Sequence, residues 1–189
     1  MRNLPTLILI LVLVPTLQAC FPVIAGGVGA GITLANDRRT SGIFIEDQGI
    51  ELKAQSRLNE KLKDQVHVNV TSYNLALLLT GEAQTPTLRA EAESVVQAVP
   101  NVRQVFNEIA IGAPSSFSNR SNDSYLTTKV KGRMIEANKF NIVHVKVVTE
   151  ANVVYLLGIV TRKEAEDATE LARTTTGVSK VIRLFEYLD

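Results

Sequence analysis

An internal repeat limits the folds open to this chain more than any other feature. Residues 66–70 read VHVNV and return as VHVKV at 143–147, and the run LLLTG at 77–81 returns as VYLLG at 154–158. Further matching pairs lie upstream: Asp47 with Asp123, Lys53 with Lys129, and Arg57 with Arg133. Because the offset between matching residues changes by only one position along the chain, the repeat predicts two copies of one small domain, at 46–112 and 122–189.

Each copy carries the same order of secondary-structure signals. Runs with valines at alternate positions indicate strands, and capping residues with Pro or Gly at the ends mark the helices. The expected elements are a helix at 50–63 or 124–138, a strand at 66–71 or 142–149, a second strand at 75–81 or 153–160, a second helix at 87–99 or 162–175, and a last strand at 102–111 or 178–188. This α-β-β-α-β order predicts an α+β fold, with two helices packed on a three-stranded mixed sheet in each domain.

The segment between the copies, residues 113–121, is rich in Ser, Asn and Pro and is interpreted as a linker, with a loop that lies along one domain as the alternative. A domain of about 65 residues has a marginal core. We therefore expect the two domains to contact each other. The chain has no Trp and few aromatic residues, so the cores must be built mainly from Val, Leu and Ile.

The N-terminus has the three parts of a secretory signal. Arg2 supplies positive charge, residues 7–14 form an apolar core, and Ala19 is a small residue before the expected cut. The core is short for a membrane span, which takes roughly 20 apolar residues. The sequence predicts a signal peptide at 1–19. An ordinary signal peptide that leaves Cys20 as a free thiol and an uncleaved anchor are the two alternatives.

Cys20 is the single cysteine of the chain, and it closes the sequence LQAC at 17–20. A branched apolar residue at −3, a small residue before the cut and a thiol at +1 are the layout of a bacterial lipidation site. We therefore predict that Cys20 carries covalent lipid and that residues 20–45 form a flexible tether. Phe21 stands where an Asp would indicate inner-membrane retention, so we expect the outer membrane, with the protein facing the periplasm.

The charge balance and the isolated polar residues argue against several classes of function. The chain has 20 basic and 19 acidic residues, whereas nucleic-acid binding usually requires a strongly basic surface. His67 and His144 stand alone between valines, without the neighbouring Cys or carboxylates of a metal site. Ser115, Ser116 and Ser118 have no nearby His that would suggest a nucleophile. We expect neither an enzyme nor a cofactor other than the lipid on Cys20.

Several stretches resemble a known family. The runs LALLLTG at 75–81 and VVYLLG at 153–158, with SNDSYLTTKV at 121–130 and GIVTRKEA at 158–165, are similar to BON domains. A lipidation site followed by two such domains resembles the dual-BON-domain lipoproteins of Gram-negative outer membranes. One departure is the first hairpin turn, which has Asn74-Leu75 where the family usually has a Gly.

The resemblance implies a non-enzymatic role. Proteins of this kind support outer-membrane integrity, concentrate at division sites, and bind anionic phospholipids through the first helix of the second BON domain. In this chain, the corresponding residues are Tyr125, Leu126, Lys129, Val130, Lys131 and Arg133. An alternative role is a protein-interaction module for partners in outer-membrane assembly or peptidoglycan remodelling.

The same helix can be interpreted from its periodicity alone. Leu126, Val130 and Met134 form one stripe that should face the sheet, and Tyr125 lies on an adjacent stripe with Lys129 and Arg133. Each cation near an anionic membrane contributes about 1 kcal/mol. An ordinary solvated helix face is the alternative interpretation. The first copy lacks the aromatic residue and has more acidic residues, so we expect it to bind lipid less well.

Overall fold

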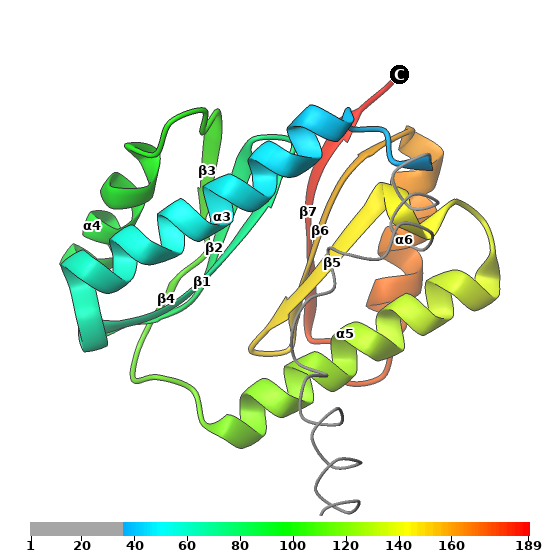
Figure 1. Cartoon of the computed structure of the whole chain (residues 1–189). Helices are drawn as coiled ribbons and strands as arrows, with labels where there is room; N and C mark the ends of the chain where they lie inside the picture. The colour runs from blue at the N-terminus through cyan, green and yellow to red at the C-terminus, as the bar shows by residue number, and fades with distance from the viewer. Residues whose placement is uncertain (1–35) are drawn as a thin grey trace, which may run out of the picture. The chain divides into compact units, whose positions relative to one another are not determined.

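The computed structural model describes residues 36–189 (Figure 1). The predicted signal peptide and Cys20 lie outside the described residues. The first domain contains α3 (Ser41–Leu62), η2 (Lys63–Gln65), β1 (Val66–Tyr73), β2 (Ala76–Ala83), α4 (Pro86–Gln97), β3 (Gln104–Asn107) and β4 (Ala110–Ile111). The second contains α5 (Phe117–Ala137), η3 (Ile142–His144), β5 (Val145–Glu150), β6 (Val153–Val160), α6 (Arg162–Arg173) and β7 (Lys180–Tyr187).

Both sheets are mixed and have the same topology. In the first sheet, β1 pairs antiparallel with β2, and β2 pairs parallel with β3 and with the short β4. In the second sheet, β5 pairs antiparallel with β6, and β6 pairs parallel with β7. The predicted α+β fold of two tandem α-β-β-α-β units is confirmed.

Each central strand is buried on both of its faces. In β2, Leu77 and Leu79 join the core under α3 and α4, while Leu78 between them belongs to a separate apolar cluster. Successive side chains of a strand point to opposite faces, so an unbroken leucine run requires apolar neighbours on both sides of the sheet. The matching run in β6 behaves in the same way, with Leu156 in one core and Leu157 in the other cluster.

The separate apolar cluster, which is distinct from the core of each domain, lies between the two domains. Its buried members come from both sheets: Tyr73 and Leu78 from the first domain, and Tyr155 and Leu157 from the second. Burial, together with the nearby carboxylates of Glu108 and Glu150, raises the pKa of Tyr155 to about 12, so this phenol stays neutral. The contact expected between two small domains is therefore present as a shared apolar interface.

The two hairpins turn in the same way although neither turn contains a glycine. The central residues, Asn74-Leu75 and Ala151-Asn152, all have positive φ, as a two-residue type I′ turn requires. The carboxylate of Asp47 accepts hydrogen bonds from the backbone N–H groups of Asn74 and Leu75, each at 2.8 Å. Asp123 accepts from Ala151 and Asn152 at 3.0 and 2.9 Å, and so stabilises the second turn equivalently.

The glycine that follows the apolar run has a steric role in both domains. A Cβ on Gly81 would lie 2.0 Å from the carbonyl oxygen of His67, and one on Gly158 would lie 2.3 Å from that of His144. These distances are far below van der Waals contact. The backbone of the neighbouring strand or its preceding turn therefore excludes any side chain here.

Several element boundaries differ from those expected. Helix α5 begins at Phe117 instead of 124, because the Ser116 hydroxyl caps it by accepting from the N–H of Asn119, so residues 117–121 are helical and not part of a linker. Helix α3 begins at Ser41 behind the N-cap Thr40, so residues 41–45 do not belong to a flexible tether. Smaller differences are the splitting of the 102–111 strand into β3 and β4, and the 3₁₀ turn η3 before β5.

Candidate functional site

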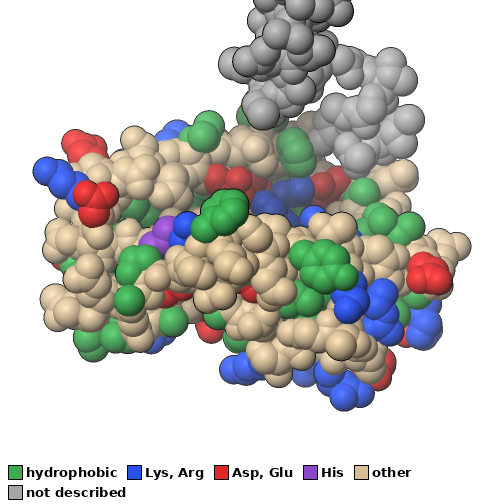
Figure 2. All heavy atoms as spheres, turned by 90° about the horizontal axis from the view of Figure 1, so that it is seen from below, with side chains coloured by type: hydrophobic (Ala, Val, Ile, Leu, Met, Phe, Trp, Pro, Cys, Tyr) green, Lys and Arg blue, Asp and Glu red, His purple; other side chains and the backbone are tan. Residues whose placement is uncertain are grey.

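The outward side of α5 carries three exposed apolar side chains. Phe117 is 79% exposed, Tyr125 is 62% exposed and Ile135 is 61% exposed. At 100° per residue these three lie within one quarter of the helix circumference, opposite the buried stripe. We call this surface the outer face of α5. It extends from Phe117 to Ile135, which is 18 residue steps or about 27 Å at the α-helical rise. Figure 2 shows hydrophobic and basic side chains gathered over this part of the molecule.

Two lysines accompany the apolar side chains. The Lys129 ammonium lies 6.0 Å from the centroid of the Tyr125 ring and donates a 3.0 Å hydrogen bond to the carbonyl oxygen of Thr176. Lys131 is exposed on the adjoining side of the helix. Gly132 lies on the outer face, where a Cβ would meet no atom within 4 Å. The outer face therefore offers two aromatic rings, one aliphatic side chain and two cations to a flat partner.

Three of the six residues carried over from the family are not on this face. Leu126 is 2% exposed and Val130 is 0% exposed, because both belong to the stripe that packs on the sheet. The Arg133 guanidinium donates to the carbonyl oxygen of Leu171 at 2.8 Å and to the hydroxyls of Thr174 and Thr175. These acceptors lie at the end of α6, where unpaired carbonyl groups favour a cation. Arg133 therefore joins α5 to α6, and Tyr125, Lys129 and Lys131 remain as surface candidates.

Sequence reasoning missed Phe117 and Ile135. Phe117 lies in the segment interpreted as a linker. Ile135 lies outside the stripe formed by Tyr125, Lys129 and Arg133. The two residues are 18 positions apart, which is five helical turns, so they lie on the same side of one continuous helix. The signal that could have found them was the cap: Ser116 stands directly before an aromatic residue at the start of the helix.

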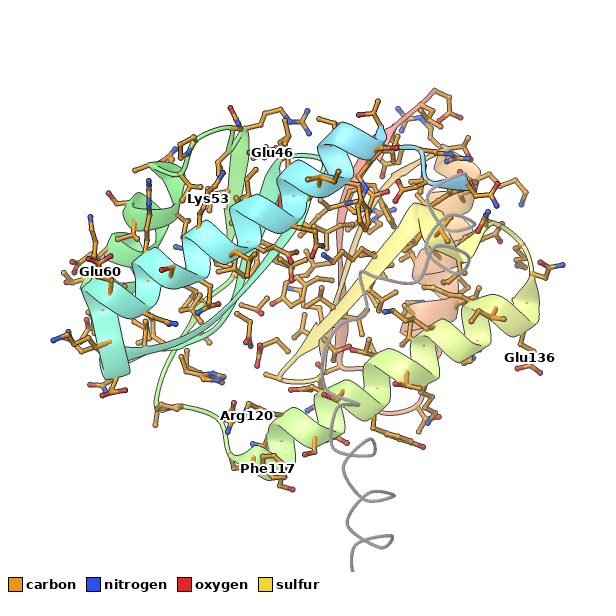
Figure 3. The ribbon with its side chains drawn as sticks, in the orientation of Figure 1. Glu46, Lys53, Glu60, Phe117, Arg120 and Glu136 are labelled. Carbon is orange, nitrogen blue, oxygen red and sulfur yellow. The ribbon has the colours of Figure 1, made fainter. Side chains whose placement is uncertain are left out.

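The equivalent helix of the first domain also exposes apolar residues. Ile45 is 69% exposed and Leu52 is 74% exposed on α3. Their neighbours are of mixed charge: Lys53 pairs with Glu46 at 3.7 Å, and Glu60 is also exposed. Figure 3 shows these three charged residues along α3, and Phe117, Arg120 and Glu136 along α5. The exposed apolar side chains of the first helix are thus both aliphatic, since its Phe44 is half-buried, and carboxylates lie beside its lysine.

Each of the two histidines has a glutamate carboxylate near its Nδ1 atom, Glu82 for His67 and Glu164 for His144, but their other contacts differ. His67 Nδ1 lies 3.1 Å from the carboxylate of Glu82 on the paired strand, while His144 Nε2 lies 3.1 Å from the carbonyl oxygen of Asn36. Within residues 36–189, no cluster of three His, Cys, Asp or Glu side chains could hold a metal ion. None of the helices in this part of the chain has both the length and the hydrophobicity to cross a membrane.

The fold and its doubled hairpin motif define a class of protein. The BON domain profile matches residues 46–113 and 122–189, and the chain belongs to this family. It is 35% identical to the outer membrane lipoprotein DolP of Haemophilus influenzae over 175 residues, which cover 92% of this chain and 91% of that protein. It is 31% identical to the 21 kDa hemolysin of Actinobacillus pleuropneumoniae over 154 residues, covering 80% and 79%.

A solved structure also matches at low similarity. The C-terminal domain of CdsD, a structural protein of the type III secretion system of Chlamydia trachomatis, aligns over 77% of this chain and 98% of its own. The TM-score is 0.31 and the sequence identity is 13%. At that level the match supports no conclusion about function.

Proposed function

We propose that this chain is an outer-membrane lipoprotein, held by lipid on Cys20 and facing the periplasm, that binds anionic phospholipid through the outer face of α5. The role is one of binding and not of catalysis. The relative with 35% identity is itself an outer membrane lipoprotein. The observation that carries the lipid-binding proposal is the exposure of Phe117, Tyr125 and Ile135 on one side of a helix that also carries Lys129 and Lys131.

The chemistry of this face suits a phospholipid surface. Tyrosine places an apolar ring at the acyl boundary and keeps its hydroxyl among the headgroups. Each lysine near an anionic surface adds about 1 kcal/mol, which salt screens within about 8–10 Å. Lys129 already lies beside the Tyr125 ring, so inserting the ring brings the ammonium to headgroup depth. Binding should then require both negative lipid charge and the apolar side chains.

Lipid anchoring strengthens the membrane binding of a helix that binds lipid only weakly by itself. A covalent lipid keeps the folded unit near the bilayer, so the helix experiences a high effective concentration of lipid. In this account, Cys20 supplies residence on the membrane and the outer face of α5 selects the lipid beneath it. Maintenance of outer-membrane integrity, with enrichment at division sites, is the cellular role that we propose for this selection.

Vesicle flotation tests the lipid-binding proposal. The mature chain with Cys20→Ser is mixed with vesicles of phosphatidylcholine alone or with 30% phosphatidylglycerol, because removing the anchor isolates the contribution of α5. We expect flotation only with the anionic vesicles and a steep loss between low and high salt. Equal flotation with neutral vesicles, or none with anionic vesicles at low salt, would contradict the proposal.

A second function is supported by the exposed side chains of α3. Ile45 and Leu52 lie one heptad apart, so they share one side of that helix. A neighbourhood of mixed charge gives an anionic membrane no net attraction there, which leaves a protein partner, in envelope assembly or peptidoglycan remodelling, as the candidate ligand. Crosslinking in intact cells from Leu52→Cys tests it: a specific adduct supports this function, and adducts no different from those of Lys61→Cys oppose it.

A further inference from the structure

Residues 36–39, which precede the N-cap Thr40 of α3, contact both domains. Arg38 belongs to the second domain by its contacts: its guanidinium makes a bidentate ion pair with Glu164, at 2.6 and 2.9 Å, and donates to the carbonyl oxygen of Ile159 at 2.8 Å. The carbonyl oxygen of Asn36 lies 3.1 Å from His144 Nε2, again in the second domain. Both the Arg38 and the Glu164 side chains are largely removed from solvent, at 24% and 16% exposure.

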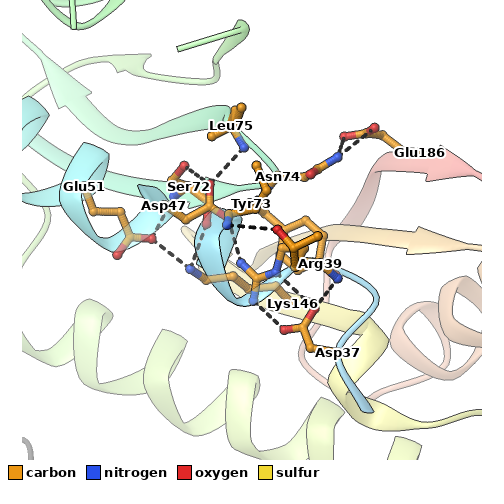
Figure 4. Close-up of polar contacts among 12 residues, drawn as sticks. Asp37, Arg39, Asp47, Glu51, Ser72, Tyr73, Asn74, Leu75, Lys146 and Glu186 are labelled. Carbon is orange, nitrogen blue, oxygen red and sulfur yellow. Dashed lines mark hydrogen bonds and ion pairs between the residues drawn. The ribbon is translucent and has the colours of Figure 1, made fainter. Parts of the chain in front are cut away.

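The next residue contacts the first domain instead. The Arg39 guanidinium pairs with Asp47 at 2.8 Å and lies over the Tyr73 ring, 4.1 Å from its centroid. Asp37 holds the same guanidinium from the other side at 2.7 Å. Figure 4 shows Arg39 between Asp37, Tyr73 and Asp47. Asp47 is the residue that stabilises the first hairpin turn, so Arg39 is fixed to a rigid part of the first domain.

We propose that residues 36–39 form an interdomain strap, in which adjacent arginines bind different BON domains and fix the angle between them. The strap lies directly between the lipidation site and α3. Without the strap, the N-terminal segment would join the folded unit at the first domain alone. With the strap, it joins at the junction of both domains. Tension on the lipid anchor would then act on the junction of both domains, and α5 would keep one orientation relative to the point at which the N-terminal segment joins them.

The geometry of the Arg38 pair favours a strong contact. Bidentate Arg–carboxylate pairs have two parallel hydrogen bonds and are among the strongest charge-assisted contacts. Glu164 is held rigidly for this purpose, because it is also the N3 residue of the α6 capping box and accepts from the N–H of Thr161 at 2.8 Å. Losing Arg38 would leave this carboxylate without its principal cation. His144, whose Nδ1 lies 3.4 Å from Glu164, would be the remaining basic neighbour.

Other contacts also cross the interface, so the test must isolate the strap. Lys146 pairs with Glu51 at 2.8 Å, Asn69 binds Glu150 at 2.9 Å, and Asn74 binds Glu186 at 3.0 Å. These contacts and the shared apolar cluster hold the domains in contact. The strap is expected to narrow the range of interdomain angles and not to decide whether the domains associate.

Distances between spin labels measure that range directly. The mature lipoprotein, lipidated on its single native cysteine and kept in mild detergent, carries labels at Leu52→Cys on α3 and Glu136→Cys on α5, both at exposed positions. We expect one narrow distance distribution, which Arg38→Ala broadens at least twofold. The matched control is Arg173→Ala, which breaks an exposed ion pair with Glu170 within α6 and should leave the width unchanged.

Two further substitutions at Arg38 complete the design, because Glu164 must stay in place as the N3 residue of the α6 capping box. Arg38→Gln removes the ion pair and should broaden the distribution, whereas Arg38→Lys keeps a cation beside Glu164 and should give a narrower one than Arg38→Gln. A width for Arg38→Ala equal to that of Arg173→Ala would overturn the strap. If Arg38→Ala alters the circular dichroism, these two variants decide: a broader distribution for Arg38→Gln than for Arg38→Lys supports the strap, and equal widths overturn it. The measurement uses no phospholipid, so its outcome is independent of lipid binding by α5.

Discussion

Asp47 and Asp123 occupy equivalent positions in the two domains, and each carboxylate accepts hydrogen bonds from both central N–H groups of a hairpin turn. Both are almost fully buried, at 0% and 5% exposure. A turn with positive φ at two non-glycine residues is strained, and the carboxylate offsets that strain. The pair explains how this chain makes two type I′ turns without the glycine that such turns favour.

Replacement of Asp123 by alanine should lower the stability of the protein. The backbone N–H groups of Ala151 and Asn152, which lie on an exposed turn, would lose their carboxylate acceptor, at a cost of about 1–3 kcal/mol. Asp47→Ala should cost more, because Asp47 also accepts from Ser72 and pairs with Arg39. Urea denaturation followed by circular dichroism measures both. An Asp47→Ala variant that is less affected than Asp123→Ala would contradict this ranking.

Glycine substitutions should have opposite effects at two positions. Gly158→Ala places a methyl group 2.3 Å from a backbone carbonyl oxygen, so we expect severe destabilisation or failure to fold. Gly132→Ala is the matched control, because its Cβ meets open space and alanine favours the helix by about 0.5–1 kcal/mol. Thermal unfolding should show a lowered midpoint for the first variant and a raised midpoint for the second. A Gly158→Ala protein as stable as wild type would contradict the steric argument.

Much of the architecture was predictable because it depends on local patterns. The alternating valines of β1, the continuous apolar runs of β2 and β6, and the Pro86 and Gly177 boundaries were all visible in the chain. Because the sequence repeats, each helix or strand is indicated twice, and the pattern in one copy supports the equivalent element in the other. The burial of Leu126 and Val130 on the sheet-facing side of α5 likewise follows from the helical stripe.

The parts that were missed depend on contacts between distant residues. Residues 36–39 have no periodic pattern, and their order comes from partners such as Asp47 and Glu164 far along the chain. Arg133 was interpreted as a surface cation because its acceptors lie at the end of a different helix. Phe117 was hidden because Ser- and Asn-rich sequence is typical of both linkers and helix starts. Only the folded chain separates these cases.

The free energy of unfolding should fall at acid pH because Glu164 becomes protonated. The Arg38 guanidinium and the Thr161 N–H outweigh the effect of burial and lower the Glu164 pKa from 4.5 to about 2. A depressed pKa in the folded state stabilises the protein above the unfolded pKa, and this contribution is lost as the pH falls from about 4.5 towards 2.

The difference in unfolding free energy between wild type and Glu164→Gln isolates this contribution. Other carboxylates titrate in the same range but are common to both proteins. We expect wild type to be the more stable at pH 6 and the difference to shrink steadily below pH 4.5. A difference that stays constant between pH 6 and pH 3 would show that the Glu164 charge contributes no stability.

The anchor should be separable from the fold. Cys20→Ser removes the proposed lipidation site while leaving residues 36–189 unchanged. We therefore expect the variant to leave the membrane fraction and appear as soluble periplasmic protein, with the same unfolding midpoint as wild type. Cell fractionation and thermal unfolding measure the two properties. Retention in the outer membrane after fractionation would show that Cys20 is not the anchor.

The most direct test of the account compares one substitution on each equivalent helix. Tyr125→Glu on α5 and Leu52→Glu on α3 both replace an exposed apolar side chain with a carboxylate, and both are measured by flotation with anionic vesicles in the Cys20→Ser chain. We predict that Tyr125→Glu lowers the apparent affinity at least about tenfold, a loss of roughly 1.4 kcal/mol, with unchanged circular dichroism. Leu52→Glu should bind as the parent does. Equal affinities for the two variants would contradict the assignment of lipid binding to the outer face of α5.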